Sequence, residues 1–152
     1  MGGERGHRAV AHTADVILEA WAPDLPGCLE EAVAALAEVY ARPAASAEGA
    51  EDAEPAEGPA PVGRPVRIPP GLPETQLVDL LDEVLFALDT EVDVPVAAEV
   101  RVTDGGALDA VLRLAPRDRV EPAGAVPKAI SRSELAVRQT PEGVSCRFLV
   151  DV

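Results

Sequence analysis

Two aspartates occupy positions from which their carboxylates could bind a cation. Asp15 stands at the start of an alternating apolar segment, and Asp151 ends the last apolar segment, directly before Val152. If these segments are antiparallel neighbours in a sheet, the start of one lies beside the end of the other. Asp15, Asp151 and the terminal carboxylate of Val152 would then converge.

Convergence of these carboxylates has an electrostatic cost that a cation would remove. Two carboxylates ~4 Å apart repel each other by about 1 kcal/mol in water, and by about 4 kcal/mol at an effective dielectric constant of about 20. Oxygen ligands alone suit Ca²⁺ or Mg²⁺ rather than Zn²⁺. The spacing leaves an alternative open, which is the more common case for such residues: two solvated aspartates at strand ends.

Two further side chains could take part in binding. His12 precedes Thr13 at the entry to the first apolar segment, where a hydrogen-bonded structural histidine is more common than a ligand or a base. Lys128 follows Pro127 and opens another apolar segment, where it could balance charge or contact a phosphate or an acidic partner. His7 lies in an N-terminal tail that we expect to be mobile.

Motifs for nucleophilic catalysis or phosphate binding are not found. The sequence contains no GxSxG, no Walker loop and no GxGxxG that follows a strand. With two histidines in the chain, a histidine-based hydrolase has little to build on. A divalent-cation-dependent hydrolase that uses Asp15 and Asp151 remains an alternative, as does a chaperone-like binding module.

Composition restricts the partners. The chain has 152 residues and a formal net charge of −14, from 13 Lys and Arg against 27 Asp and Glu. Such a surface repels phosphates and argues against direct, stable nucleic-acid binding, whereas it suits cations or a basic protein. No apolar stretch approaches the length of a membrane span, and the N-terminus does not resemble a signal peptide. We therefore expect a cytoplasmic protein without membrane contact, for which a homo-oligomer is one allowed state.

The hydrophobic pattern predicts an α+β fold in one domain. Two amphipathic helices are expected, with apolar stripes that include Leu29 and Leu36 in the first and Leu77 and Leu81 in the second. We expect them to pack on one face of a mixed, largely antiparallel sheet of about six or seven strands. The predicted helices cover 28–41 and 74–89, and the predicted strands cover 8–22, 64–68, 96–102, 108–114, 128–139 and 144–150.

Two other features complete the pattern. Residues 43–63 hold five acids, no base and mostly Ala, Pro and Gly. This composition predicts a mobile insert, because such a segment cannot bury enough apolar surface to offset its ordering entropy.

Cys28 and Cys146 match no metal-binding spacing, and we expect both to be small buried apolar side chains.

Taken in order, these segments resemble the archease family. The resemblance rests on His12-Thr13-Ala14-Asp15 followed by a strand into Ala20-Trp21, on the Leu-rich second helix that ends in Asp89-Thr90-Glu91, on Lys128-Ala129-Ile130, and on the ending Phe148-Leu149-Val150-Asp151-Val152. It covers nearly all of the chain except residues 43–63. Ser131-Arg132-Ser133 departs from the Thr-Tyr-His run of many members.

The resemblance implies a non-catalytic accessory protein. Archeases assist the RtcB-type RNA ligase in tRNA splicing and RNA repair by promoting its guanylylation and multiple turnover. The family binds a divalent cation, Ca²⁺ in some members, through positions that correspond to Asp15 and Asp151, with Val152 alongside. The family's activating lysine corresponds to Lys128.

Overall fold

The computed structural model describes residues 4–10, 15–43, 62–124 and 126–152, and these form two α-helices and three antiparallel sheets. The expected α+β class is confirmed. The strands divide into a four-stranded sheet in the order β1-β2-β9-β8, a three-stranded sheet in the order β4-β6-β5 and a two-stranded sheet of β3 and β7. The strands are β1 (Gly6–Val10), β2 (Asp15–Ala22), β3 (Ala41–Pro43), β4 (Val62–Ile68), β5 (Val94–Val102), β6 (Leu108–Ala115), β7 (Val120–Pro122), β8 (Ala129–Thr140) and β9 (Gly143–Asp151).

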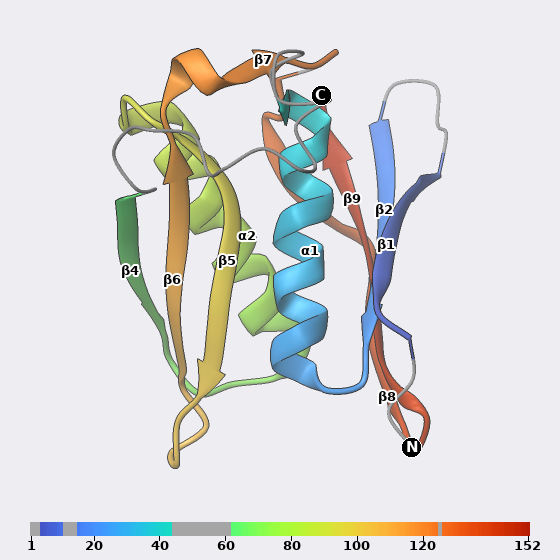
Figure 1. Ribbon diagram of the computed structural model, residues 1–152. Coiled ribbons are helices and arrows are strands. Elements are labelled where there is room, and N and C mark those ends of the chain that lie inside the picture. Colours follow the sequence, from blue (N-terminus) through green and yellow to red (C-terminus); the bar gives the residue numbers. More distant parts are fainter. Residues whose placement is uncertain (1–3, 11–14, 44–61, 125) are drawn as a thin grey trace.

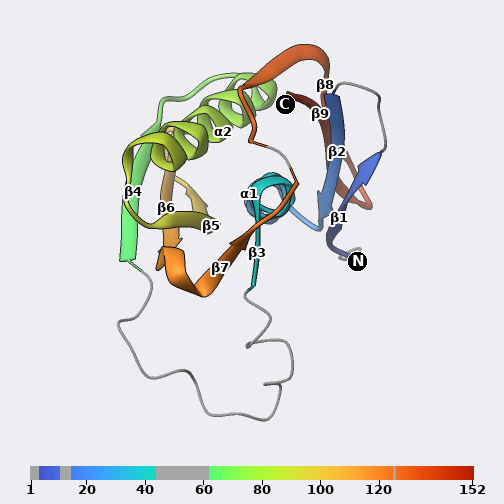
Figure 2. The same cartoon turned by 90° about the horizontal axis from the view of Figure 1, so that it is seen from above.

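Helix α1 (Leu25–Tyr40) explains why the strands do not form one sheet. It lies between the four-stranded and the three-stranded sheet, as the view from above shows most clearly (Figures 1 and 2). Its apolar side chains are buried on several sides, and many of them are alanines, which let both sheets approach the helix axis. The backbone N–H of Val100 in β5 donates a hydrogen bond to Glu30 of α1 at 2.9 Å, so this edge of the small sheet is bound to the helix instead of to another strand.

The start of α1 lies before its predicted position. The helix begins at Leu25, because the Asp24 side chain accepts a hydrogen bond from the backbone N–H of Gly27 at 2.9 Å and thereby caps the first turn. Pro26 lies within that turn, where its missing N–H costs nothing. The Pro26-Gly27 pair therefore belongs to the helix, although the same residues predicted a break before it.

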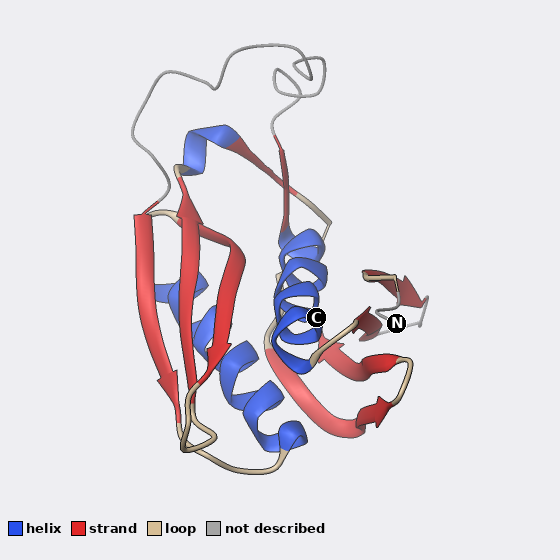
Figure 3. Cartoon of the chain, turned by 60° about the horizontal axis from the view of Figure 1, so that its bottom comes forward, coloured by secondary structure: helices blue, strands red, loops and turns tan. Residues whose placement is uncertain are grey.

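Helix α2 (Pro73–Thr90) packs across the three-stranded sheet and also contacts β8 (Figure 3). Its position agrees with the predicted helix at 74–89. The buried Gln76 side chain donates hydrogen bonds to the carbonyl oxygens of Pro69 and Gly106 at 3.1 and 2.9 Å, which ties the helix start to the β5–β6 turn. Neither described helix combines the length and the apolar composition that a membrane crossing needs.

The N-terminal strand prediction was wrong in one respect. Residues 8–22 do not form one strand: β1 and β2 pair as antiparallel neighbours, from Gly6 opposite Trp21 to Val10 opposite Ile17. The alternation of apolar residues is similar on both sides of the reversal, so periodicity alone did not locate it. Of the predicted insert at 43–63, residues 44–61 lie outside the described residues, whereas Pro43 ends β3 and residues 62 and 63 begin β4.

Candidate functional site

Asp15 and Asp151 lie directly opposite each other on β2 and β9. The antiparallel pairing that the sequence suggested is therefore present in the fold. Directly opposite residues of an antiparallel pair point to the same face of the sheet, with Cβ atoms about 4.5–5.5 Å apart. Both aspartates are half-buried, so the pair lies at the border between the sheet and solvent.

The register of β2 on β9 is fixed by the core. Leu18 and Ala20 lie opposite Phe148 and Cys146, and all four side chains are buried on the face that covers α1. A slip of one residue would turn this apolar row to the other face. The packing of the core consequently holds the two aspartates in register on the opposite face.

Lys128 reaches the same end of the sheet. Its backbone N–H donates a hydrogen bond to the carbonyl oxygen of Asp151 at 2.8 Å, and the next residue, Ala129, is the register partner of Asp151. The Lys128 side chain is exposed, whereas Pro127 before it is buried. Val152 is partly buried and packs against the core. His12 lies outside the described residues.

The aspartate pair has no counter-charge within the described part of the chain. Neither carboxylate takes part in a described ion pair or side-chain hydrogen bond. By contrast, Glu19, which points to the same face of β2, accepts hydrogen bonds from Arg8 at 2.5 Å and Arg147 at 3.0 Å. The hydrogen bond from Arg8, assisted by Arg147, outweighs burial and lowers the pKa of Glu19.

The two aspartates provide oxygen ligands of the type that a hard cation prefers, but they are too few to complete its coordination. Two facing carboxylates are suitable ligands for Ca²⁺ or Mg²⁺, and the pair contains no nitrogen or sulfur donor that would favour a softer metal. Among the described residues, no group of three or more His, Cys, Asp or Glu side chains is arranged to hold a metal ion. Asp15 and Asp151 would thus supply only some of the six to eight oxygen ligands that Ca²⁺ takes.

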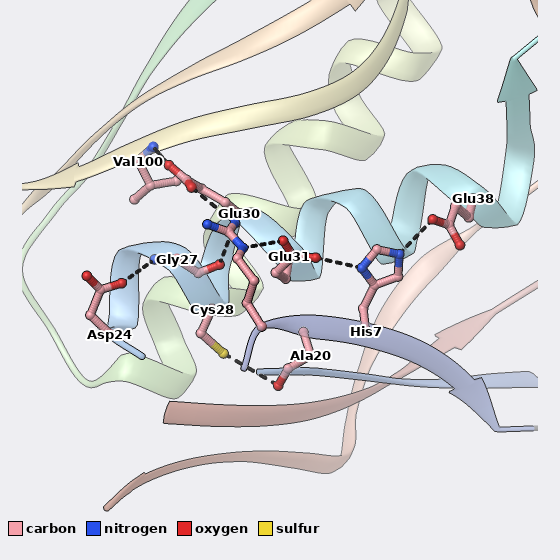
Figure 4. Close-up of polar contacts among 10 residues, drawn as sticks. His7, Ala20, Asp24, Gly27, Cys28, Glu30, Glu31, Glu38 and Val100 are labelled. Atoms are coloured by element: carbon pink, nitrogen blue, oxygen red, sulfur yellow. Dashed lines mark hydrogen bonds and ion pairs between the residues drawn. The ribbon is translucent and has the colours of Figure 1, made fainter. Parts of the chain in front are cut away.

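A second charged cluster joins β1 to α1, and sequence reasoning missed it (Figure 4). The two ring nitrogens of His7 face Glu31 at 2.7 Å and Glu38 at 2.6 Å. Arg5 adds ion pairs to Glu31 at 2.5 Å and Glu30 at 3.4 Å. His7 therefore lies in an ordered strand and not in a mobile tail.

The cluster stabilises the charged form of its histidine. Burial opposes protonation of His7, but hydrogen bonds to Glu38 and Glu31 outweigh it and raise the pKa of the imidazole. Burial likewise opposes ionisation of Glu31, and hydrogen bonds from His7 and Arg5 lower the pKa of that carboxyl nonetheless. The i and i+7 spacing of Glu31 and Glu38, beside basic residues early in the chain, is the signal that could have predicted this cluster.

Comparison with known proteins identifies the family. The model of the archease protein family (MTH1598/TM1083) matches residues 7–152. The chain belongs to the archease family. Proteins of two Mycobacterium tuberculosis strains, both called probable archease, are 36% identical to it over 151 residues, which is 99% of this chain and 77% of theirs.

Solved structures share the archease fold. A Methanobacterium thermoautotrophicum protein, 1598, determined in solution, matches 97% of this chain and 99% of its own with a TM-score of 0.69 and 22% identity. A crystal structure of a Thermotoga maritima archease, described as a possible chaperone, matches 95% of this chain and 96% of its own with a TM-score of 0.62 and 16% identity. At these identities the likeness concerns the fold alone.

Proposed function

We propose that this archease is a non-catalytic protein cofactor that promotes guanylylation and multiple turnover of an RtcB-type RNA ligase in the cytoplasm. Family membership carries the proposal. The net charge of −14 supports it, because an acidic protein disfavours holding RNA itself but can associate rapidly with a basic, RNA-binding ligase.

The site that we assign to this function is the end of the β2–β9 pair. Asp15 and Asp151 would hold a divalent cation, for which Ca²⁺ is the first candidate and Mg²⁺ the second, with Val152 alongside as the third residue of the site. When bound, the cation would neutralise the carboxylates and offer its remaining coordination positions to oxygen atoms of the partner. The exposed Lys128 would contact a phosphate or an acidic group of the ligase complex.

The test is a multiple-turnover RNA-joining assay with the cognate ligase, GTP and Mn²⁺. We expect this archease to raise both the turnover number and the rate of ligase guanylylation, and to join no RNA when the ligase is omitted. Each tenfold change in rate corresponds to about 1.4 kcal/mol of activation free energy. Unchanged turnover and guanylylation would reject the function.

Variants locate the site separately from the function. Asp15→Asn and Asp151→Asn should remove most of the activation, and Lys128→Ala should reduce it. Asp104→Asn is the matched control, because Asp104 is exposed in the β5–β6 turn at the other end of the molecule and its replacement removes the same charge (Figure 1). Equal activation by all four variants would leave the function in place and reject the site.

The same purified protein can be used to test the two alternative functions, a cation-dependent hydrolase and a general chaperone. A cation-dependent hydrolase would turn over a substrate without the ligase, and that turnover would be lost in Asp15→Asn. A general chaperone would suppress aggregation of unrelated proteins and would bind an apolar dye, since that activity needs a large exposed apolar surface.

A further inference from the structure

Cys28 and Cys146, which are far apart in the sequence, share one place in the core. Cys28 lies in α1 and Cys146 in β9, and their exposed fractions are 0% and 4%. Both are free thiols, and both were expected to be buried. Their proximity was not predictable from the sequence, because it depends on where α1 crosses the four-stranded sheet.

The small side chain of Ala20 explains how Cys28 of α1 comes close to the four-stranded sheet. Ala20 of β2 is the register partner of Cys146 and points to the same inner face. Its methyl group leaves room for α1, so that the Cys28 thiol reaches the sheet and donates a hydrogen bond to the Ala20 carbonyl oxygen at 3.6 Å (Figure 4). The Cys28 and Cys146 thiols are therefore both placed beside Ala20, at the interface between α1 and the four-stranded sheet.

The two thiols differ in acidity. The neighbouring Cys146 side chain lowers the pKa of Cys28, against the opposing effects of burial and of the Glu31 carboxylate. The Cys28 side chain, together with burial, raises the pKa of Cys146. Cys28 also lies near the N-terminus of α1, where the helix dipole favours a thiolate. Cys28 has the properties of an attacking sulfur, and Cys146 those of the resolving one.

We propose that Cys28 and Cys146 form an oxidation site at which hydrogen peroxide closes an intramolecular disulfide bond between α1 and β9. The Cys28 thiolate attacks one peroxide oxygen, the O–O bond breaks, and hydroxide leaves and takes up a proton to form water. The resulting Cys28 sulfenic acid is attacked by the Cys146 sulfur, the S–O bond breaks, and a second water leaves with the Cys146 proton. In total, two thiols lose two protons and two electrons to one peroxide.

The disulfide bond would cross-link α1, which lies between the two sheets, to β9, which ends at Asp151. Such a cross-link restricts the unfolded chain more strongly the longer the loop it closes. Because both thiols are buried, peroxide reaches them when the sheet and the helix separate locally, so oxidation is slow on the native protein.

Intact-mass analysis after peroxide treatment tests the proposal on the full chain. The reduced protein is incubated with hydrogen peroxide, and remaining thiols are then alkylated in denaturant. We expect a product that has lost two hydrogen atoms and accepts no alkyl group, and a non-reducing peptide map that joins the Cys28 and Cys146 peptides. This product should melt at a higher temperature than the reduced protein, and dithiothreitol should reverse the shift.

Single-cysteine variants provide the matched controls. Cys146→Ala and Cys28→Ala each leave one cysteine, so both should form no intramolecular bond and show no dithiothreitol-reversible rise in melting temperature. The wild-type measurement decides the matter even if a variant fails to fold. Two alkylatable thiols after treatment, added oxygen atoms without loss of hydrogen, or covalent dimers in place of the internal bond would each overturn the proposal.

Discussion

The carboxylates at the end of the β2–β9 pair and those on the side of α1 are in opposite electrostatic situations. Asp15 and Asp151 face each other without a counter-charge from the described residues. Glu31, by contrast, is bound by both Arg5 and His7, and its side chain is only 16% exposed. Both regions place acids at the border of the core.

The difference separates a carboxylate that the chain itself neutralises from a carboxylate pair that it does not. A carboxylate that the chain's own cations neutralise contributes to the cohesion of β1 and α1. A carboxylate pair that the fold holds together without neutralising it retains its electrostatic cost until something else supplies positive charge. The charge of a carboxylate therefore says less about its role than the charges that surround it.

Cation binding should produce the largest contrast between the two regions. Ca²⁺ or Mg²⁺ should raise the melting temperature of the wild type, because a ligand bound only by the folded state adds about 2.7 kcal/mol of stability at a hundredfold excess over its Kd. Asp15→Asn and Asp151→Asn should lose most of this rise, whereas Glu31→Gln should keep it. Thermal melts with added cation and with chelator measure the effect, and an equal rise in all variants would mean that the ion binds elsewhere.

Without a cation, substitutions that neutralise a carboxylate should change the stability of the protein in opposite directions in the two regions. Asp15→Asn should stabilise the protein by about 1 kcal/mol, because it removes the repulsion from Asp151. Glu31→Gln should destabilise it by about 1–2 kcal/mol, because it weakens charge-assisted hydrogen bonds to His7 and Arg5 at a largely buried position. Urea unfolding in chelator gives both values, and two changes of the same sign would remove the distinction drawn above.

The charged cluster that joins β1 to α1 should make the free energy of unfolding depend on pH, through the titration of His7. The folded-state pKa of His7 is raised from its usual 6.5, so the folded protein binds more protons than the unfolded chain at intermediate pH. Its stabilisation is complete below pH 6.5 and is lost as the pH rises through the folded-state pKa. Unfolding free energies of wild type and His7→Gln, measured from below to above this range, should converge as the pH rises; parallel curves would contradict the assignment.

The smallest effect is expected from Arg5. Its side chain is 48% exposed, so the ion pairs to Glu30 and Glu31 are screened by solvent. Arg5→Ala should cost about 0.5 kcal/mol, and high salt should reduce the difference from wild type. Urea unfolding at low and high ionic strength measures it, and a loss as large as that of Glu31→Gln would show that Arg5, and not His7, is the main partner of Glu31.

The sequence predicted the elements whose signals are local. The apolar stripe of α2 and the alternation in β9 place these elements almost as the structure has them. The Asp15–Asp151 pairing followed from one topological assumption, that the first and last apolar segments are neighbours, and the fold satisfies it. The family assignment rested on ordered motifs, and the comparisons confirm it.

Features that depend on tertiary position were not predictable in this way. The short strands β3 and β7 have no alternation long enough to detect, and they pair because the chain after α1 lies beside the chain before β8. The His7 cluster and the placement of Cys28 and Cys146 beside Ala20 both arise where α1 crosses β1, β2 and β9. Single-sequence patterns do not specify such a crossing.

The pairing of β2 with β9 also determines when the site can form during synthesis. Asp15 lies in β2 and Asp151 in β9, so the carboxylates meet only after β9 has been synthesised and has paired with β2. Until then the edge of β2 that pairs with β9 is open, and α1 has no complete sheet to cover it. Contacts between segments so far apart in sequence fold slowly. The Asp15–Asp151 pair is therefore complete only once the four-stranded sheet has formed, because its two carboxylates come from two strands of that sheet.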